Sequence, residues 1–291
     1  MTEPIGVVGL GVMGSAMARN LIAAEHEVLG FDVDPAKVSA FGDMGGEPVT
    51  SADEIAALSD LVIFSLPTTT ALALVAAEIA EQDRHGLVCL ETGTFPLADK
   101  VAARDVLADA GVDLLDTPLS GTGLQAADAT LVVFASGSRE SFEKARPVFD
   151  AIGRSTHYLG EFGNGSKMKY IANLLVAVHG LAAAEAHALG IAAGLDPALV
   201  QEVMEDGVGS SKIFEIRGPM MVADDYPAAA RLDILLKDST LIRDFARSVG
   251  APTPLLDAAV PVYEASSEAG LGDFDAAALC RYLEDVGGLE R

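Results

Sequence analysis

The chain has 291 residues, of which 43 are acidic and 19 basic, giving a formal net charge of −24. This excess of negative charge disfavours nucleic acid and anionic membranes as partners. The length suits about two domains. Every apolar stretch of about 18 residues is interrupted by charges or helix-breaking residues, so no transmembrane helix is expected. The two cysteines lack metal-ligand spacing.

The N-terminal segment leads directly into a predicted strand at residues 5–9, without the basic region or cleavage site of a signal peptide. We therefore expect a cytoplasmic protein. A glycine turn follows the strand, apolar residues then repeat at helical spacing from Met13 to Ala24, and residues 27–32 form a second predicted strand.

The glycine turn has the G-x-G-x-x-G spacing of a dinucleotide-binding loop. The first glycine permits the tight turn, the second lets the backbone approach a pyrophosphate, and the third lets the helix pack on the strand. The start of the helix then faces the phosphates with its positive end. We predict cofactor binding by Gly9, Leu10, Gly11, Val12, Met13 and Gly14.

Asp32 ends the second predicted strand and is placed to accept hydrogen bonds from the adenosine ribose. A carboxylate there repels a 2′-phosphate, and no arginine follows closely, so we predict NAD rather than NADP. The alternative is that Asp34, before Pro35, contacts the ribose while Asp32 caps a turn.

Further apolar runs at 61–67, 87–92, 112–120 and 130–137 alternate with helical stretches and predict a parallel sheet covered on both faces. Ligands bind outside the carboxyl ends of such strands. Leu66, Pro67 and Thr94 follow strand ends and are cofactor-site candidates, although ordinary turns would explain them equally well.

The loop at 116–123 offers the hydroxyl of Ser120 and the approachable backbone of Gly121, Thr122 and Gly123. Such a loop can hold a carboxylate, and a plain turn is the competing interpretation. From Gly165 the pattern becomes helical, with one long stretch at 165–193. We expect an α/β fold in which a Rossmann-like dinucleotide-binding domain (1–162) precedes an all-α substrate and dimerisation domain (163–291), joined through a long interdomain helix.

Two lysines stand at the start of this helix and point to nearly opposite faces, because successive helical residues rotate by about 100°. Lys169 shares a face with Ser166 and Asn173, whereas Lys167 shares one with Ile171 and Leu174. A lysine beside a reacting carbon can transfer a proton to or from oxygen. Lys169 is the catalytic candidate, against the simpler possibility of a solvated lysine.

The five histidines show no ligand spacing, so we assign no metal.

Four motifs in order resemble the β-hydroxyacid dehydrogenase family, which includes 3-hydroxyisobutyrate dehydrogenase, tartronate semialdehyde reductase and 6-phosphogluconate dehydrogenase. They are "GLGVMGSAMARNL", "DTPLSGTGLQAADATL", "GNGSKMKYIAN" and "KDSTLIRDFA". The resemblance covers nearly the whole chain. It implies that Lys169 is the acid/base and that Asn173 is an amide that orients the substrate or Lys169. It also implies that Ser120 and Gly121 bind the substrate carboxylate, with Thr122 beside them in the substrate site. It places Thr94, Leu66, Pro67 and Lys237 at the cofactor, with Lys237 closing over it from the helical domain.

The sequence departs from the family pattern at a few positions. Thr122 replaces the second glycine of the substrate loop, Ala172 replaces an asparagine, and the usual Asp-x-Ser-Thr reads Glu91-Thr92-Gly93-Thr94. These departures leave the substrate open.

We expect an NAD-dependent oxidoreductase that interconverts a small anionic 3-hydroxy acid and its semialdehyde by hydride transfer. The alternatives are a tartronate semialdehyde or other short-chain semialdehyde reductase, an imine reductase and a non-catalytic NAD(P)-binding module. The long apolar helix predicts a homodimer or homotetramer.

Overall fold

The computed structural model describes residues 3–82 and 84–291. The chain forms two compact units, Met1–Lys169 and Tyr170–Arg291. The expected boundary between residues 162 and 163 lies just before α9 (Asn164–Ala192), and the two units divide within that helix. Its 29 residues are continuous, as the sequence predicts.

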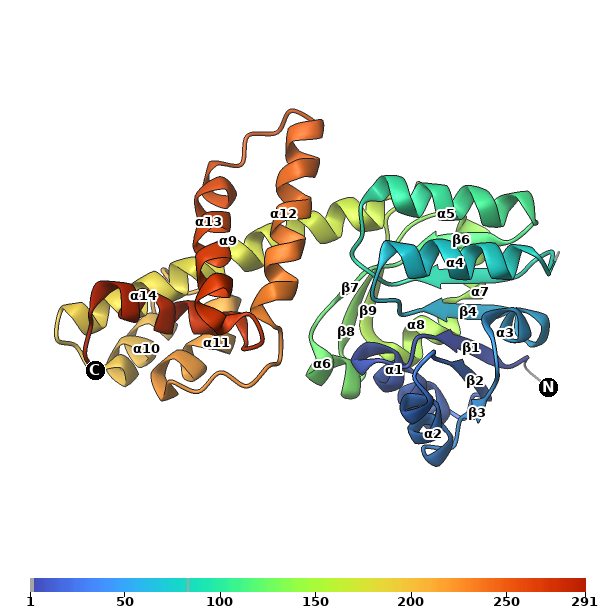
Figure 1. Ribbon diagram of the computed structural model, residues 1–291, viewed down its shortest axis with the longest axis horizontal. Coiled ribbons are helices and arrows are strands. Elements are labelled where there is room, and N and C mark those ends of the chain that lie inside the picture. Colours follow the sequence, from blue (N-terminus) through green and yellow to red (C-terminus); the bar gives the residue numbers. More distant parts are fainter. Residues whose placement is uncertain (1–2, 83) are drawn as a thin grey trace. The chain divides into compact units, whose positions relative to one another are not determined.

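The first unit is built on a six-stranded parallel sheet with the order β3-β2-β1-β4-β5-β6 (Figure 1). Its strands are β1 (Ile5–Val8), β2 (Val28–Phe31), β3 (Glu47–Pro48), β4 (Leu61–Phe64), β5 (Val88–Glu91) and β6 (Asp113–Asp116). The strand order reverses between β1 and β4, and ligands of such sheets bind in the crevice beyond the strand ends at that point. The predicted Rossmann-like fold is confirmed.

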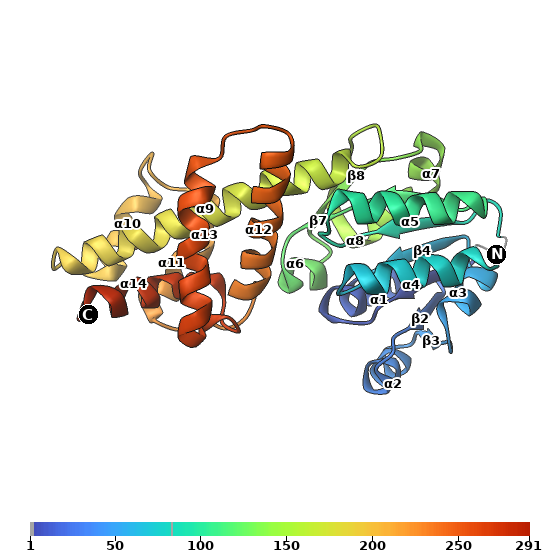
Figure 2. The ribbon, with the colours of Figure 1, turned by 45° about the horizontal axis from the view of Figure 1, so that its top comes forward.

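Alternate residues of the central strands supply two separate cores, because successive side chains of a strand point to opposite faces. Val7 and Ile63 pack with α1 (Val12–Ala23) and α8 (Arg146–Ile152). Val8 and Val62 pack with the helices of the other face. Those helices are α3 (Ala52–Leu58), α4 (Thr69–Ala80) and α5 (Leu97–Asp109), and Figure 2 shows α4 and α5 side by side. A further helix, α2 (Pro35–Asp43), follows β2.

The prediction that the strand at 130–137 joins the parallel sheet is wrong. It forms β8 (Leu131–Ala135), the centre of a second sheet with β7 (Leu119–Ser120) and β9 (Gly153–Tyr158). β8 pairs antiparallel with β7 and parallel with β9. Only the short helix α6 (Gly123–Ala127) connects β7 to β8, and a parallel pair needs a longer crossover. The longer segment with α7 (Arg139–Lys144) and α8 leads to β9.

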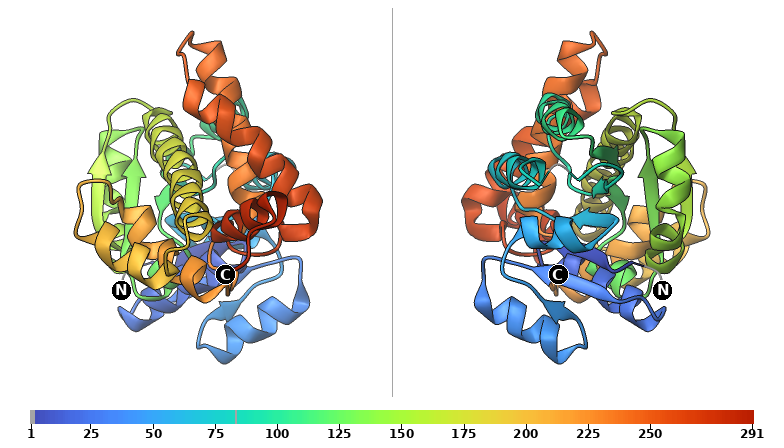
Figure 3. Two further views of the ribbon diagram at one scale, coloured as in Figure 1. Left: turned by 90° about the vertical axis from the view of Figure 1, so that its left-hand side faces the viewer. Right: turned by 90° about the vertical axis from the view of Figure 1, so that its right-hand side faces the viewer.

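The second unit is helical, as expected, and continues from α9 through α10 (Pro197–Glu205), α11 (Lys212–Ala223), α12 (Leu232–Ser248), α13 (Pro254–Ser266) and α14 (Leu279–Gly287). The helices α12 and α13 lie side by side as a hairpin, seen from two sides in Figure 3. Leu235, Ser239, Ile242 and Ala246 repeat at three- and four-residue spacing on the buried face of α12, which explains how this helix packs.

Helix α9 is the one described helix that is long and apolar enough to cross a membrane by length and composition. Half of its most apolar window is buried within the protein, and core helices of globular domains have the same composition. Tyr170, Ala177 and Ala184 of α9 belong to the core of the second unit. Much of the apolar character of α9 is therefore explained by packing within the chain.

Candidate functional site

The glycine loop after β1 has the backbone geometry that its spacing predicts. Gly9 has φ +95°, and a side chain there would collide with the carbonyl of Ser65 at the end of β4. A side chain at Gly14 would collide with the carbonyl of Gly9. Apart from its chain neighbours, no atom lies within 4 Å of the Cβ position of Gly11, so the backbone is open at the N-cap of α1. This open approach at a helix N-terminus suits a pyrophosphate. The other predicted residues of this segment are Leu10, which lies in the loop, and Val12 and Met13, which form the first turn of α1.

Asp32 is bound to this loop. Its Oδ2 accepts a hydrogen bond from the Leu10 N–H at 2.8 Å, and its Oδ1 accepts one from the Asp34 N–H at 2.9 Å. Asp34 caps α2 by accepting a hydrogen bond from the Ala36 N–H at 2.9 Å. Asp32 thus also closes a turn, and contact of either carboxylate with a ribose stays a prediction.

Lys37 was not among the predicted site residues, and its Nζ lies 3.4 Å from Asp32 Oδ2. The prediction of NAD over NADP rested on the absence of a nearby arginine, but a lysine can also attract a 2′-phosphate. Lys37 is five positions after Asp32, on the first helix after β2. This short separation in the sequence could have identified Lys37 as a neighbour of Asp32.

The ends of β4 and β5 are joined by Thr92, whose Oγ1 donates a hydrogen bond to the Phe64 carbonyl at 2.7 Å. Leu66 is half-buried and Pro67 is exposed in the segment between β4 and α4. Thr94 is half-buried in the loop between β5 and α5. The structure therefore places these three predicted residues after the carboxyl ends of adjacent strands.

The predicted substrate loop lies against the glycine loop. A side chain at Gly123 would collide with Val12, so the two loops are in close approach. Ser120 is half-buried at the end of β7, and Gly121 has φ +143°, a conformation that favours glycine. Ser120, Gly121 and the glycine loop thus belong to one region of the first unit.

The departure at Thr122 has a local explanation, because this residue is the N-cap of α6. Its Oγ1 accepts a hydrogen bond from the Leu124 N–H at 3.3 Å and donates one to Gln125 Oε1 at 2.5 Å. The Thr122 N–H also donates to Gln125 Oε1 at 2.8 Å, which completes a capping box. The Thr122 hydroxyl is thus engaged in the helix cap, and its assignment to the substrate stays a prediction.

The two lysines of α9 lie in different surroundings, as their faces predict. Lys167 is exposed and donates a hydrogen bond to Asn164 Oδ1 at 3.0 Å. Lys169 is half-buried, and the residues that share its face, Ser166 and Asn173, are 1% and 8% exposed. The polar face of α9 that carries Lys169 is therefore the buried one.

Asn173 has a buried partner on α12 that was not among the predicted site residues. Its Nδ2 donates a hydrogen bond to Asp238 Oδ2 at 2.8 Å, and Asp238 is only 5% exposed. Lys237 Nζ lies 3.0 Å from the other Asp238 oxygen, on α12. Asp238 could have been identified from the motif "KDS", in which it directly follows the predicted site residue Lys237. The assignment of Lys237 to the cofactor stays a prediction.

A buried charged cluster lies beneath the ends of β5 and β6. Lys100 Nζ is 2.5 Å from Glu91 Oε2 and 2.9 Å from Asp116 Oδ1, and all three side chains have no exposed surface. We call these three residues the Lys100 cluster. Burial by itself lowers the pKa of Lys100, but the two carboxylates outweigh burial and hold that pKa above its ordinary value. Burial raises the pKa of the Glu91 carboxyl, against the opposing effect of Lys100. Glu91 was recognised from the sequence only as a departure from the family pattern, and Lys100 was not predicted.

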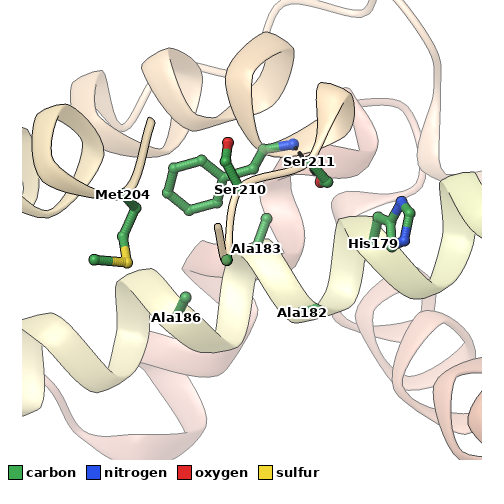
Figure 4. A pocket seen from close by; sticks show the side chains of 9 residues that line it. His179, Ala182, Ala183, Ala186, Met204, Ser210 and Ser211 are labelled. Carbon is green, nitrogen blue, oxygen red and sulfur yellow. Dashed lines mark hydrogen bonds between the residues drawn. The ribbon is translucent and has the colours of Figure 1, made fainter. Parts of the chain in front are cut away.

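The second unit contains a cavity of about 170 Å³ that none of the predicted residues lines (Figure 4). Its wall includes His179, Ala183, Ser210 and Phe214. Ser211, also in the wall, caps α11 by accepting a hydrogen bond from the Phe214 N–H. In residues 3–82 and 84–291, no group of three His, Cys, Asp or Glu side chains could hold a metal ion.

Two family models together match most of the chain. One, described as the NAD-binding domain of 6-phosphogluconate dehydrogenase, matches residues 4–160. The other, described as NAD-binding of NADP-dependent 3-hydroxyisobutyrate dehydrogenase, matches residues 163–283.

The chain is 35% identical to an L-threonate dehydrogenase of Cupriavidus necator, over 98% of each chain. It is similar to a crystal structure of 3-hydroxyisobutyrate dehydrogenase from Salmonella typhimurium, with 31% identity, a TM-score of 0.87, and 96% of this chain and 99% of that one covered. A Mycobacterium tuberculosis 3-hydroxyisobutyrate dehydrogenase with L-serine has a TM-score of 0.89 at 28% identity, over 97% and 99% of the two chains. An imine reductase of Streptomyces aurantiacus shares the fold alone, at 18% identity and a TM-score of 0.66.

Proposed function

This chain belongs to the β-hydroxyacid dehydrogenase family, and we propose that it oxidises a small 3-hydroxy acid with NAD, with Lys169 as the general base. The observation that carries the proposal is the position of Lys169 on the buried polar face of α9, one turn after Ser166, while Lys167 is exposed. In the reverse direction Lys169 acts as the acid, and the protein reduces the carbonyl product, which is a semialdehyde where the oxidised hydroxyl is primary and a ketone where it is secondary.

Different residues of the first unit would bind the cofactor, bind the substrate and transfer the proton. The nicotinamide cofactor supplies the hydride acceptor when it is bound. The open backbone at Gly11 and the start of α1 would hold its pyrophosphate, and Asp32 its ribose. Ser120 and the backbone at Gly121 would hold the substrate carboxylate. Lys169 removes the hydroxyl proton as the carbonyl forms.

The substrate class that we propose is a short hydroxy acid such as L-threonate, L-serine or 3-hydroxyisobutyrate. The proposal is supported by two relatives that are similar along nearly the whole chain. One is an L-threonate dehydrogenase, and the other is a 3-hydroxyisobutyrate dehydrogenase whose structure was solved with L-serine. The imine reductase alternative has only a shared fold in its favour, and an amine-plus-ketone assay tests it.

The first experiment is a spectrophotometric screen at 340 nm with NAD or NADP and these acids, together with glycerate. Lys169→Ala is expected to lower kcat by about 10²–10⁴-fold, the usual contribution of a general acid or base. Lys167→Ala is the matched control, two positions away on the exposed face, and is expected to leave kcat within about twofold. Equal losses in both variants, or an active Lys169→Ala enzyme, would contradict the proposal.

The preference for NAD rests on the carboxylate of Asp32. Asp32→Asn removes the charge that repels a 2′-phosphate and leaves Lys37 to attract it. The ratio of kcat/KM for NADP over NAD is expected to rise about tenfold, or about 1.4 kcal/mol. Asp34→Asn, which can still cap α2, is the control. A ratio that is unchanged in Asp32→Asn, or raised equally in both, would show that Asp32 does not select the cofactor.

We also propose that the protein is a homodimer or homotetramer that packs through the C-terminal half of α9. This half of the helix and α10 border a groove of about 660 Å³ that we call the apolar groove. Its walls include Leu189, Leu195, Leu199 and Val203, which are 72%, 51%, 49% and 51% exposed. Side chains of this kind, gathered in one place, are typical of a protein interface.

A further inference from the structure

The Lys100 cluster buries one cation and two anions that none of the proposed chemical steps uses. Removing charges from water is unfavourable, and a buried ion pair offsets this cost only with close contacts and further hydrogen bonds. The cluster has both, because Lys100 Nζ also donates a hydrogen bond to the Gly93 carbonyl at 2.7 Å. The cluster's contacts hold two segments of the first unit.

The first segment is the loop that carries Thr94. Lys100 holds the Gly93 carbonyl, and Glu91 Oε1 accepts a hydrogen bond from the Gly93 N–H at 2.8 Å. A side chain at Gly93 would collide with the Phe95 ring and come within 2.8 Å of Glu91 Oε1. Both backbone polar groups of the residue before Thr94 are thus fixed by the cluster. This contact also explains the departure Glu91-Thr92-Gly93-Thr94, because the acid and the glycine fit each other.

The second segment is the first turn of α9. Asp116 Oδ2 accepts a hydrogen bond from the Ser166 N–H at 2.7 Å, and Asp116 Oδ1 accepts one from the Ser166 hydroxyl at 2.8 Å. The Gly165 N–H donates to Ser136 Oγ at 2.9 Å, and that hydroxyl lies 3.3 Å from Asp116 Oδ2. A side chain at Gly165 would collide with the Phe134 carbonyl. The helix therefore begins directly on the cluster, one turn before Lys169.

We propose that Glu91, Lys100 and Asp116 are positioning residues for the hydride-transfer reaction, which fix the Thr94 loop and the start of the Lys169 helix to one another inside the first unit. This inference rests on the proposed function of Lys169. The cluster touches neither substrate nor cofactor in this role. It acts through the backbone at Gly93 and Ser166. A displacement of about 1 Å at a reacting group is enough to cost about a hundredfold in rate.

The direct variant, Lys100→Met, leaves two carboxylates buried without a cation and can prevent folding. Ser166→Ala is the more informative variant, because it removes one hydrogen bond to Asp116 and keeps the helix. Ser141→Ala is its matched control. Ser141 is 4% exposed and donates its hydroxyl to Asp113 Oδ2, at the other end of the same strand β6.

With the hydroxy acid that the screen identifies, Ser166→Ala is expected to lower kcat about tenfold and to leave the KM for NAD within about twofold. Ser141→Ala is expected to keep both constants while losing similar thermal stability. A merely structural bond predicts equal, small effects of the two variants on kcat, and that result would overturn the inference.

Amide hydrogen exchange of the segment 163–170 tests the same inference without turnover. Exchange there is expected to be at least about tenfold faster in Ser166→Ala and unchanged in Ser141→Ala. Unchanged exchange in both variants would overturn the inference. An active Lys169→Ala enzyme refutes the proposed function instead. Loss of activity in Lys169→Ala with normal kcat and normal exchange in Ser166→Ala refutes only the positioning role.

Discussion

The Lys100 cluster of the first unit and the apolar groove of the second reverse the usual distribution of side chains in opposite ways. In the first, charges are wholly buried, and in the second, large apolar side chains are exposed. The two regions differ in the contacts that their side chains make. Lys100 contacts two carboxylates and a carbonyl within its own unit. Leu189 and its neighbours remain open to solvent. The buried charges thus support the proposed internal positioning, and the exposed apolar residues support the proposed self-association.

The largest expected effect that tests this comparison is on stability. Lys100→Met leaves Glu91 and Asp116 buried without their cation, so we expect the free energy of unfolding to fall by about 3–5 kcal/mol. Urea unfolding followed by circular dichroism measures the loss. Lys144→Met, which removes a partly exposed lysine of the same unit, is expected to cost less than about 1 kcal/mol. Similar small losses in both variants would mean that the cluster is not protected from water.

The next effect concerns assembly. Leu189→Glu places a charge in the apolar groove and is expected to weaken self-association by about 2 kcal/mol, or about thirtyfold. Light scattering over a concentration series measures this change. Leu74→Glu is the control, because Leu74 is 66% exposed on α4 and lies outside the groove. A wild-type protein that is monomeric at micromolar concentration would contradict the interface, as would equal effects of the two variants.

The smallest effect comes from His187, a buried titratable side chain of the second unit. Burial lowers its pKa, its Nε2 lies 3.0 Å from Gln201 Oε1, and its ring stacks on Phe214. The unfolded chain therefore binds a proton near pH 6.5 that the folded chain binds only at lower pH. Its contribution to stability is present above pH 6.5. It is lost as the pH falls towards the folded pKa, by at most about 1.4 kcal/mol per pH unit.

His187→Gln keeps a polar group beside Gln201 and removes this titration. We expect its unfolding temperature to change less between pH 7 and pH 5 than that of the wild type, as calorimetry would show. His85→Gln, at an exposed position of the first unit, is the control for the substitution itself. A parallel pH dependence in the wild type and His187→Gln would show that His187 does not titrate in this range.

The sequence by itself determined the elements whose signals are local. The spacing of Gly9, Gly11 and Gly14 predicts the loop, because each glycine meets a steric demand within the strand, the turn and the helix. Helical rotation likewise separates Lys169 from Lys167. The parallel strands and the continuous α9 follow from apolar runs of suitable length.

Only the tertiary structure decided how distant residues meet. Nothing local pairs Lys100 with Glu91 and Asp116, or Asn173 with Asp238, 65 positions later. The sequence pattern also predicted that β8 belongs to the parallel sheet. In the structure β8 pairs antiparallel with β7, because the connection between them is too short for a parallel crossover. Periodicity reports which face of an element is buried, but it carries no information on which other element covers that face. The partners of buried polar groups are therefore fixed by the packing of the whole unit.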